Sequence, residues 1–183
     1  MKKLLENNRM GRYDRTDSNR GFSLIELIVV IAIMAIVMGF FIAGLGYLLG
    51  VNVRSCAHEI QTAVGATRIT TMGKEETELR IYRDSSDHCI YKQERVKESG
   101  ESNFTDLPAE KIGKSTLAVS YFTDDGSGGL TGETELADDS SIVIGFDRAS
   151  GKETSPYTCI RVEAGAIRMD VRIVPATGKV YTE

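Results

Sequence analysis

Residues 20–50 read RGFSLIELIVVIAIMAIVMGFFIAGLGYLLG, and most of the predicted architecture follows from them. Between Leu24 and Leu49, 26 residues carry one charged side chain, that of Glu26. A helix needs about 20 apolar residues to cross the hydrocarbon core of a bilayer, so this block is long enough to span with some tilt. A buried core helix does not need an apolar surface on every side. The stretch therefore predicts a transmembrane helix near the start of the chain.

The charges on either side of this block predict its orientation. Residues 1–21 carry six of the 22 Lys and Arg residues and three of the 26 Asp and Glu, a net charge of +3. The rest of the chain keeps 16 basic and 23 acidic residues, a net charge of −7. Basic residues favour the cytoplasmic side, so we expect a cytoplasmic N-terminus and an extracytoplasmic C-terminal domain. We expect no nucleic-acid binding, because this domain has no basic stripe to neutralise phosphates.

The apolar block differs from an ordinary secretory signal. Such a signal has an apolar core of about 7–15 residues, followed by a small-residue cleavage site. Here the run is longer, and its exit, GYLLGVNVRS at residues 46–55, has no site of that kind. We therefore expect the block to remain as the anchor of a single-pass membrane protein.

The acid inside the block, Glu26, has two interpretations. With Ser23 it fits an S-x-x-E capping box, which satisfies backbone amides at a helix start, where a carboxylate also suits the helix dipole. Alternatively, a carboxylate in a membrane segment awaits a charged partner. The residues alone favour neither interpretation.

The heptapeptide GFSLIEL at residues 21–27, which follows a basic residue, resembles the prepilin signal of type IV pilins and of the pseudopilins of secretion and DNA-uptake systems. The resemblance implies that a membrane aspartyl prepilin peptidase cuts between Gly21 and Phe22 on the cytoplasmic side. It implies that the same enzyme methylates the new amine of Phe22. It also implies that Glu26 pairs with the Phe22 amine of a neighbouring subunit during assembly.

The same resemblance, which covers residues 20–50, implies the partners. These are the membrane, other pilin-like subunits, the prepilin peptidase and an inner-membrane assembly platform. Many members carry a proline part-way along this helix, whereas residues 39–46 contain none. Four glycines either soften the helix or provide small faces for packing in lipid, namely Gly39, Gly44, Gly46 and Gly50.

Beyond the anchor the helix is expected to continue as an amphipathic segment, residues 51–73. Apolar or small residues recur there at helical spacing, and Gly73 is a natural stop. The whole helix would have roughly 50 residues. The recurring positions are Val53, Ala57, Ile60, Val64 and Thr67.

After Gly73 the pattern predicts strands and turns, so residues 74–183 are expected to form a β-rich extracytoplasmic domain. The fold class is then α+β: a long N-terminal helix packed on a mostly antiparallel sheet, with a leader at 1–21 and a transmembrane or filament-core segment at 22–50. Residues 123–139 carry six acids and no base, and we interpret them as a solvated loop. The expected strands are Thr77–Arg83, Cys89–Val96, Thr116–Phe122, Ser141–Phe146, Tyr157–Glu163, Ile167–Val174 and Lys179–Thr182.

The tail shows a second and looser resemblance, to the ends of H-type minor pseudopilins. It rests on IVIGFDRASGK at residues 142–152, CIRV at 159–162 and IRMDVRIVPATGKVY at 167–181. The two resemblances together predict a minor pilin or pseudopilin of a type IV pilus-like or type II secretion filament, located first in the membrane and later in an extracellular or periplasmic filament. The alternative is a pilin-type adhesin or a DNA-uptake subunit of a competence pilus, the one case in which nucleic acid would be a partner.

Three cysteines are too few for a disulfide-dense scaffold. Cys89 and Cys159 lie in strand-like runs and can form a disulfide if those strands are neighbours. Cys56 would then have no cysteine to pair with. Three small buried thiols are the other interpretation.

No motif in the chain indicates an enzyme or a cofactor. There is no H-E-x-x-H, G-x-S-x-G or P-loop pattern, and the Cys and His residues lack zinc-finger spacing. Asp124 and Asp125 resemble a calcium loop in composition only, because the terminal glutamate spacing of an EF-hand is missing. We therefore expect no metal, with this pair as the calcium candidate.

Overall fold

The computed structural model describes residues 22–73, 76–98, 100, 102–124 and 130–183, with the backbone alone for 42–45 and 124. The chain divides into two compact units, Met1–Phe41 and Ile42–Glu183. The expected leader at 1–21 lies outside the described residues.

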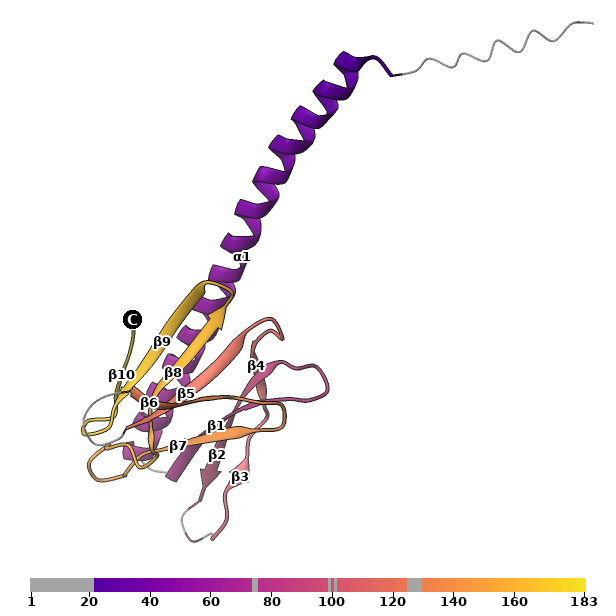
Figure 1. Cartoon of the computed structure of the whole chain (residues 1–183). Coiled ribbons are helices and arrows are strands. Elements are labelled where there is room, and N and C mark those ends of the chain that lie inside the picture. The colour runs from indigo at the N-terminus through magenta and orange to yellow at the C-terminus, as the bar shows by residue number, and fades with distance from the viewer. Residues whose placement is uncertain (1–21, 74–75, 99, 101, 125–129) are drawn as a thin grey trace, which may run out of the picture. The chain divides into compact units, whose positions relative to one another are not determined.

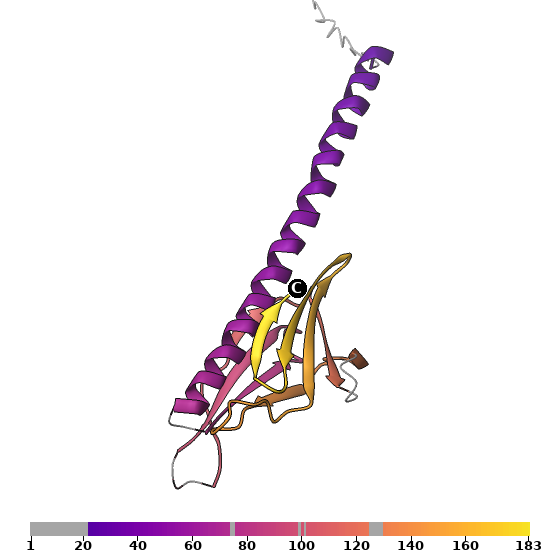
Figure 2. The ribbon, with the colours of Figure 1, turned by 90° about the vertical axis from the view of Figure 1, so that its left-hand side faces the viewer.

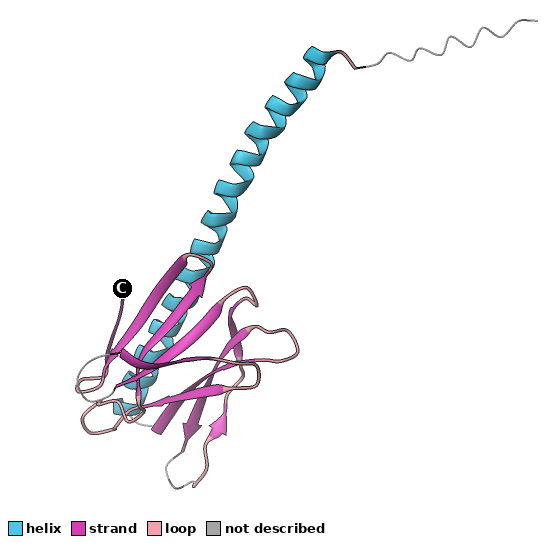
Figure 3. Cartoon of the chain, viewed as in Figure 1, coloured by secondary structure: helices cyan, strands magenta, loops and turns pink. Residues whose placement is uncertain are grey.

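One helix, α1 (Leu24–Gly73), occupies 50 residues (Figures 1 and 3). Its bounds confirm the expected long helix and its end at Gly73. The helix continues through Gly39 and Gly46 because the segment has no proline to remove a backbone donor. In the first unit, every described residue from Phe22 to Phe41 is exposed.

In the second unit, one face of α1 is buried. The buried positions recur every three or four residues, as one stripe of a helix does. All five positions expected from the periodicity are among them. The stripe consists of Val53, Cys56, Ala57, Ile60, Ala63, Val64, Thr67 and Thr71.

Ten strands follow, in two antiparallel sheets of five (Figures 1 and 2). The first sheet has the order β3-β2-β1-β7, with β4 also paired to β2, and the second has the order β10-β9-β8-β5-β6. This confirms the α+β class, although the strands form two sheets where one was expected. The strands are β1 (Glu76–Arg83), β2 (Ile90–Lys97), β3 (Thr105–Asp106), β4 (Glu110–Gly113), β5 (Ala118–Asp124), β6 (Leu130–Glu135), β7 (Ser141–Gly145), β8 (Tyr157–Ala164), β9 (Ile167–Val174) and β10 (Lys179–Thr182).

Seven strands were expected from the sequence, and β3, β4 and β6 were not. The interpretation of 123–139 as a loop is wrong, because β6 lies inside it and pairs with β5. The β6 strand is exposed at most positions and contains Gly132 at a φ of 66°. The β6 strand is therefore held by backbone pairing with β5 and contributes no apolar face to the core.

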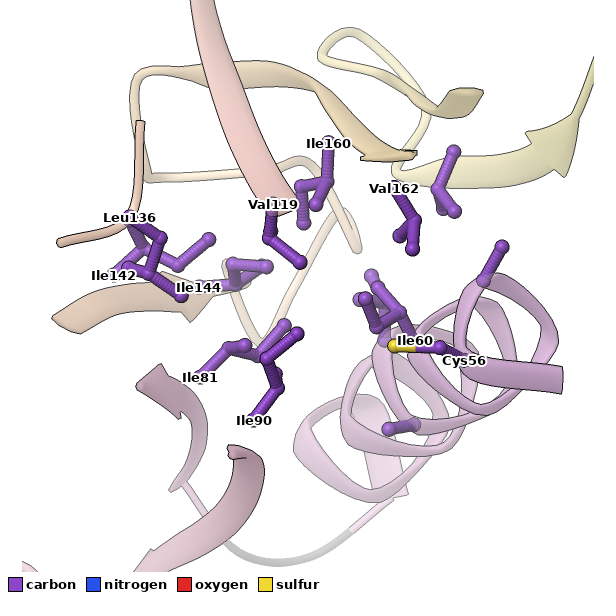
Figure 4. Close-up of a cluster of buried hydrophobic side chains, with 14 of the residues drawn as sticks. Cys56, Ile60, Ile81, Ile90, Val119, Leu136, Ile142, Ile144, Ile160 and Val162 are labelled. Atoms are coloured by element: carbon purple, nitrogen blue, oxygen red, sulfur yellow. The ribbon is translucent and has the colours of Figure 1, made fainter. Parts of the chain in front are cut away.

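The hydrophobic core lies between the two sheets and the buried stripe of α1 (Figure 4). Ile60 of the helix is fully buried, as are Ile81 of the first sheet and Ile160 of the second. Alternate residues along the central strands face this core, because side chains in a strand alternate between two faces. Ten apolar residues of the two sheets and of the segment before β5 are all buried: Leu79, Ile81, Leu117, Val119, Ile142, Ile144, Ile160, Val162, Val171 and Ile173.

A buried arginine joins the ends of several segments. Arg83, at the end of β1, is 9% exposed. Its guanidinium donates to the carbonyls of Leu136 at 3.0 Å, His88 at 3.2 Å and Leu117 at 2.7 Å. These contacts connect the first sheet to the segments that enter β5 and β7.

Candidate processing and assembly site

The start of α1 is capped by Ser23. The backbone N–H of Glu26 donates to Ser23 Oγ at 3.2 Å, and the N–H of Leu27 donates to the Ser23 carbonyl at 3.1 Å. This is the serine half of a capping box, which satisfies an amide that has no partner within the helix.

The carboxylate of Glu26 is not used by this cap. Within the described residues, no hydrogen bond from the Ser23 amide to the Glu26 side chain is present, and no cation pairs with it. The helix start is thus stabilised by the serine hydroxyl, and the acid remains open to another partner. This arrangement leaves the charge-pairing interpretation of Glu26 intact and weakens the reciprocal capping interpretation.

Apolar side chains surround this acid, and they face outward. Leu24 is 77% exposed, Ile25 is 69% exposed and Leu27 is 56% exposed. By length and composition α1 can cross a membrane, and none of its apolar window is buried by the protein itself. Such a surface fits a single-pass membrane anchor, because water is a poor solvent for so many contiguous apolar groups.

Of the two residues expected at the cleavage site, the structure describes one. Phe22 lies just before the helix, 81% exposed. Gly21 lies outside the described residues, so cleavage between the two and methylation of the Phe22 amine remain predictions.

The three cysteines are free and buried. Cys89 immediately precedes β2 of the first sheet, and Cys159 lies in β8 of the second sheet. Their strands are not neighbours, so the arrangement that the possible disulfide required is absent. Burial raises the pKa of the Cys56 thiol to about 12 and that of Cys159 to about 11, which keeps both thiols protonated at neutral pH.

The calcium candidates are only partly visible. Asp124 ends β5 and lies opposite Leu130 of β6, whereas Asp125 is outside the described residues. In the part of the chain that the structure describes, no group of three or more His, Cys, Asp or Glu side chains is placed to hold a metal ion.

One buried acid was missed from the sequence. Glu153 is 5% exposed, and its Oε1 accepts from the Ser155 hydroxyl at 2.5 Å. Among the residues that the structure describes, its Oε2 has no hydrogen-bond partner. Burial raises the pKa of Glu153 to about 7. No local pattern indicates such a position, because the burial comes from a bridge to Phe146 and a backbone bond to the carbonyl of Pro175.

Comparison with known families points to the same end of the chain. Residues 17–42 match the family model described as the prokaryotic N-terminal methylation motif. No curated protein and no solved structure matches the chain. The matched region contains Phe22, the Ser23 cap and Glu26. The chain therefore carries a prepilin signal of the type IV pilin kind, a motif of structural subunits that are processed and assembled with one another.

Proposed function

We propose that this chain is the precursor of a minor pilin or pseudopilin, which is cut after Gly21 and assembled into a type IV pilus-like or type II secretion filament. The observation that carries the proposal is the position of the methylation motif, which ends within an exposed apolar helix. That helix holds a single acid in its apolar block, Glu26, which has no ion-pair partner among the described residues. A signal placed before the apolar block leaves that block in the mature subunit.

Processing would create the charge that the acid lacks. Hydrolysis of the peptide bond after Gly21 leaves a carboxylate on Gly21 and frees the amine of Phe22. The amine then attacks the methyl group of a sulfonium donor, which leaves as a neutral thioether. The methylated amine stays a cation at neutral pH. In a bundle of apolar helices this ammonium and the Glu26 carboxylate attract strongly, and either one alone is costly to bury.

The pair would act mainly as a register device. A buried ion pair adds little net stability, because desolvation of both charges offsets most of their attraction. A wrong register, however, leaves two charges unpaired in a medium of low dielectric constant. Neighbouring subunits would therefore dock at the stagger that brings Phe22 of one to Glu26 of the other.

Substitution of Glu26 tests this role in filaments sheared from cells. Glu26→Gln keeps a side chain able to hydrogen-bond but cannot neutralise an ammonium, so we expect it to insert in the membrane, to be processed and to be scarce in filaments. Loss of one partner of a buried pair costs about 3–5 kcal/mol.

Ser23→Ala is the matched control, since it removes the cap that the structure shows and leaves the acid in place. Its cost is about 1 kcal/mol at the helix start, which should lower filament incorporation far less. Normal incorporation of Glu26→Gln would contradict the charge-pairing role.

A further inference from the structure

Three exposed cations lie on segments that meet near the point where α1 leaves the apolar block. Arg54 lies on the helix, Lys114 follows β4, and Arg168 lies near the start of β9. All three belong to the second unit. Across the described ranges of the chain, none of them has a carboxylate within salt-bridge distance, whereas the nearby Lys111 pairs with Asp87 at 3.2 Å.

The contacts of the second unit bring these segments to one stretch of the helix. A cavity of about 280 Å³ is lined by Asn52 and Ser55 of α1 and by Lys114. The Ile167 side chain lies 3.4 Å from where a Cβ on Gly50 would stand, so the β8–β9 hairpin reaches the same turn of the helix (Figures 1 and 2).

Distance along the chain puts this stretch at the membrane surface. About 20 helical residues cross the hydrocarbon core, so a span that begins at Leu24 leaves it a few residues before Tyr47. Tyr47 is 75% exposed and suits the aromatic belt at a bilayer interface. Arg54 follows seven residues later on the same helix face, about 10 Å further on. Long basic side chains at this depth extend towards headgroups.

The charge of the surrounding domain makes these cations unusual. Residues 22–183 have a net charge of −7, with 16 basic and 23 acidic residues. Asp87 pairs with Lys111, and Glu163 lies opposite Arg168 in the β8–β9 register without forming an ion pair among the described residues. The three cations are thus available to an external anion.

We propose that Arg54, Lys114 and Arg168 form a basic collar that binds the anionic phospholipid headgroups of the extracytoplasmic leaflet while the subunit is anchored in the membrane. The proposal rests on the membrane anchor of the proposed function. Headgroup phosphates supply the negative charge. Because the apolar block is already inserted in the bilayer, the cations of the collar lie close to these phosphates before they bind. The collar holds the domain against the bilayer until the subunit enters a filament.

Acylation of lysine side chains tests the collar in the full chain reconstituted into lipid nanodiscs. A neutral acylating reagent is used, and modification is measured by mass spectrometry in discs of phosphatidylcholine alone and in discs that also contain phosphatidylglycerol. In the anionic discs we expect Lys114 to be modified about fivefold more slowly, with the difference lost at high salt. Lys152, also exposed and without an ion pair among the described residues, should be modified equally in both discs.

Variants and an added anion complete the test. Replacing Arg54 and Arg168 together with Gln should weaken the protection of Lys114, while Arg148→Gln, at an exposed arginine outside the collar, should not. Equal modification of Lys114 in both discs would overturn the collar, as would equal slowing at Lys152. Slowing by inorganic phosphate in phosphatidylcholine discs would show a free-anion site instead. A chain that fails to stay in the discs would overturn the anchor itself.

Discussion

Glu153 shows how a single buried carboxyl group makes the stability of the domain depend on pH. Burial raises its pKa from 4.5 to about 7, so the folded state holds this proton more tightly than the unfolded state does. Its contribution to stability is therefore complete at low pH and is lost as the pH rises from about 4.5 to about 7.

We expect Glu153→Gln to stabilise the domain by about 2–3 kcal/mol at pH 8 and to have a small effect near pH 4. Glutamine keeps an acceptor for the Ser155 hydroxyl and carries no charge. Urea unfolding of the domain at both pH values measures the difference. A substitution whose effect is the same at pH 4 and pH 8 would contradict the raised pKa.

Two glycines with the same backbone conformation provide a matched pair of substitutions. Gly178 and Gly165 have φ values of 63° and 61°, a region that other residues adopt at a cost of about 1–2 kcal/mol. A Cβ on Gly178 would stand 2.2 Å from the carbonyl oxygen of Gly151, whereas a Cβ on Gly165 meets nothing within 4 Å. Gly151 in turn accepts from Arg68 Nε at 3.0 Å, so this close packing fixes the end of α1.

Gly178→Ala should therefore destabilise the domain by about 3 kcal/mol, and Gly165→Ala by about 1 kcal/mol. The difference isolates the steric clash from the backbone strain. Denaturant unfolding of the two variants compares them, and equal losses would mean that the turn moves away without cost.

Some of the candidate residues could be recognised from the sequence and others could not. Phe22 and Glu26 belong to one contiguous motif, so the local sequence is enough to identify them. Lys114 and Arg168 lie more than fifty residues from Arg54 in the chain, and the packing of the β4 end and of the β8–β9 hairpin brings their segments to the same stretch of α1. Glu153 depends in the same way on partners that are distant in sequence.

At the scale of the elements, the sequence pattern identifies the helix and the strands that bury an apolar face, and it misses the strands that have no such face. The helix end at Gly73 and the bounds of β9 and β10 were expected residue for residue. The strands β3 and β6 are defined only by their pairing with a neighbouring strand. Both residues of β3 are exposed, as are most residues of β6. Alternation also says which face of a strand is buried but not against which sheet, so two sheets were read as one.

The second half of α1 should be required for the domain to fold. It supplies fully buried Val53, Cys56, Ile60 and Val64 to the core between the sheets. Lys92 of β2 also pairs with Glu59 of the helix at 2.9 Å. Without these residues the core would be exposed to water along its length, at about 25 cal/mol for each Å² of apolar surface.

We therefore expect a fragment that begins at Val53 to be soluble and to unfold cooperatively, with a circular dichroism spectrum of mixed helix and strand. A fragment that begins at Glu76 should aggregate or show no cooperative transition. Equal stability of the two fragments would mean that the sheets form their own core and that α1 is only attached to it.

At the scale of the whole molecule, the chain combines an apolar helix that the protein does not cover with a domain that has its own closed core. Such a chain needs a bilayer, or the apolar helices of other subunits, to cover its first unit. The motif at residues 17–42 is that of membrane-anchored pilin-type subunits that assemble with one another, so it is consistent with either cover.

The N-terminus of the mature protein tests this account most directly. Mass spectrometry and N-terminal sequencing of the membrane-bound protein from its own cells should give a chain that begins at a methylated Phe22. In cells without the prepilin peptidase, the same protein should keep residues 1–21. A mature chain that keeps residues 1–21 in peptidase-containing cells, or one that begins after Leu49, would contradict the account.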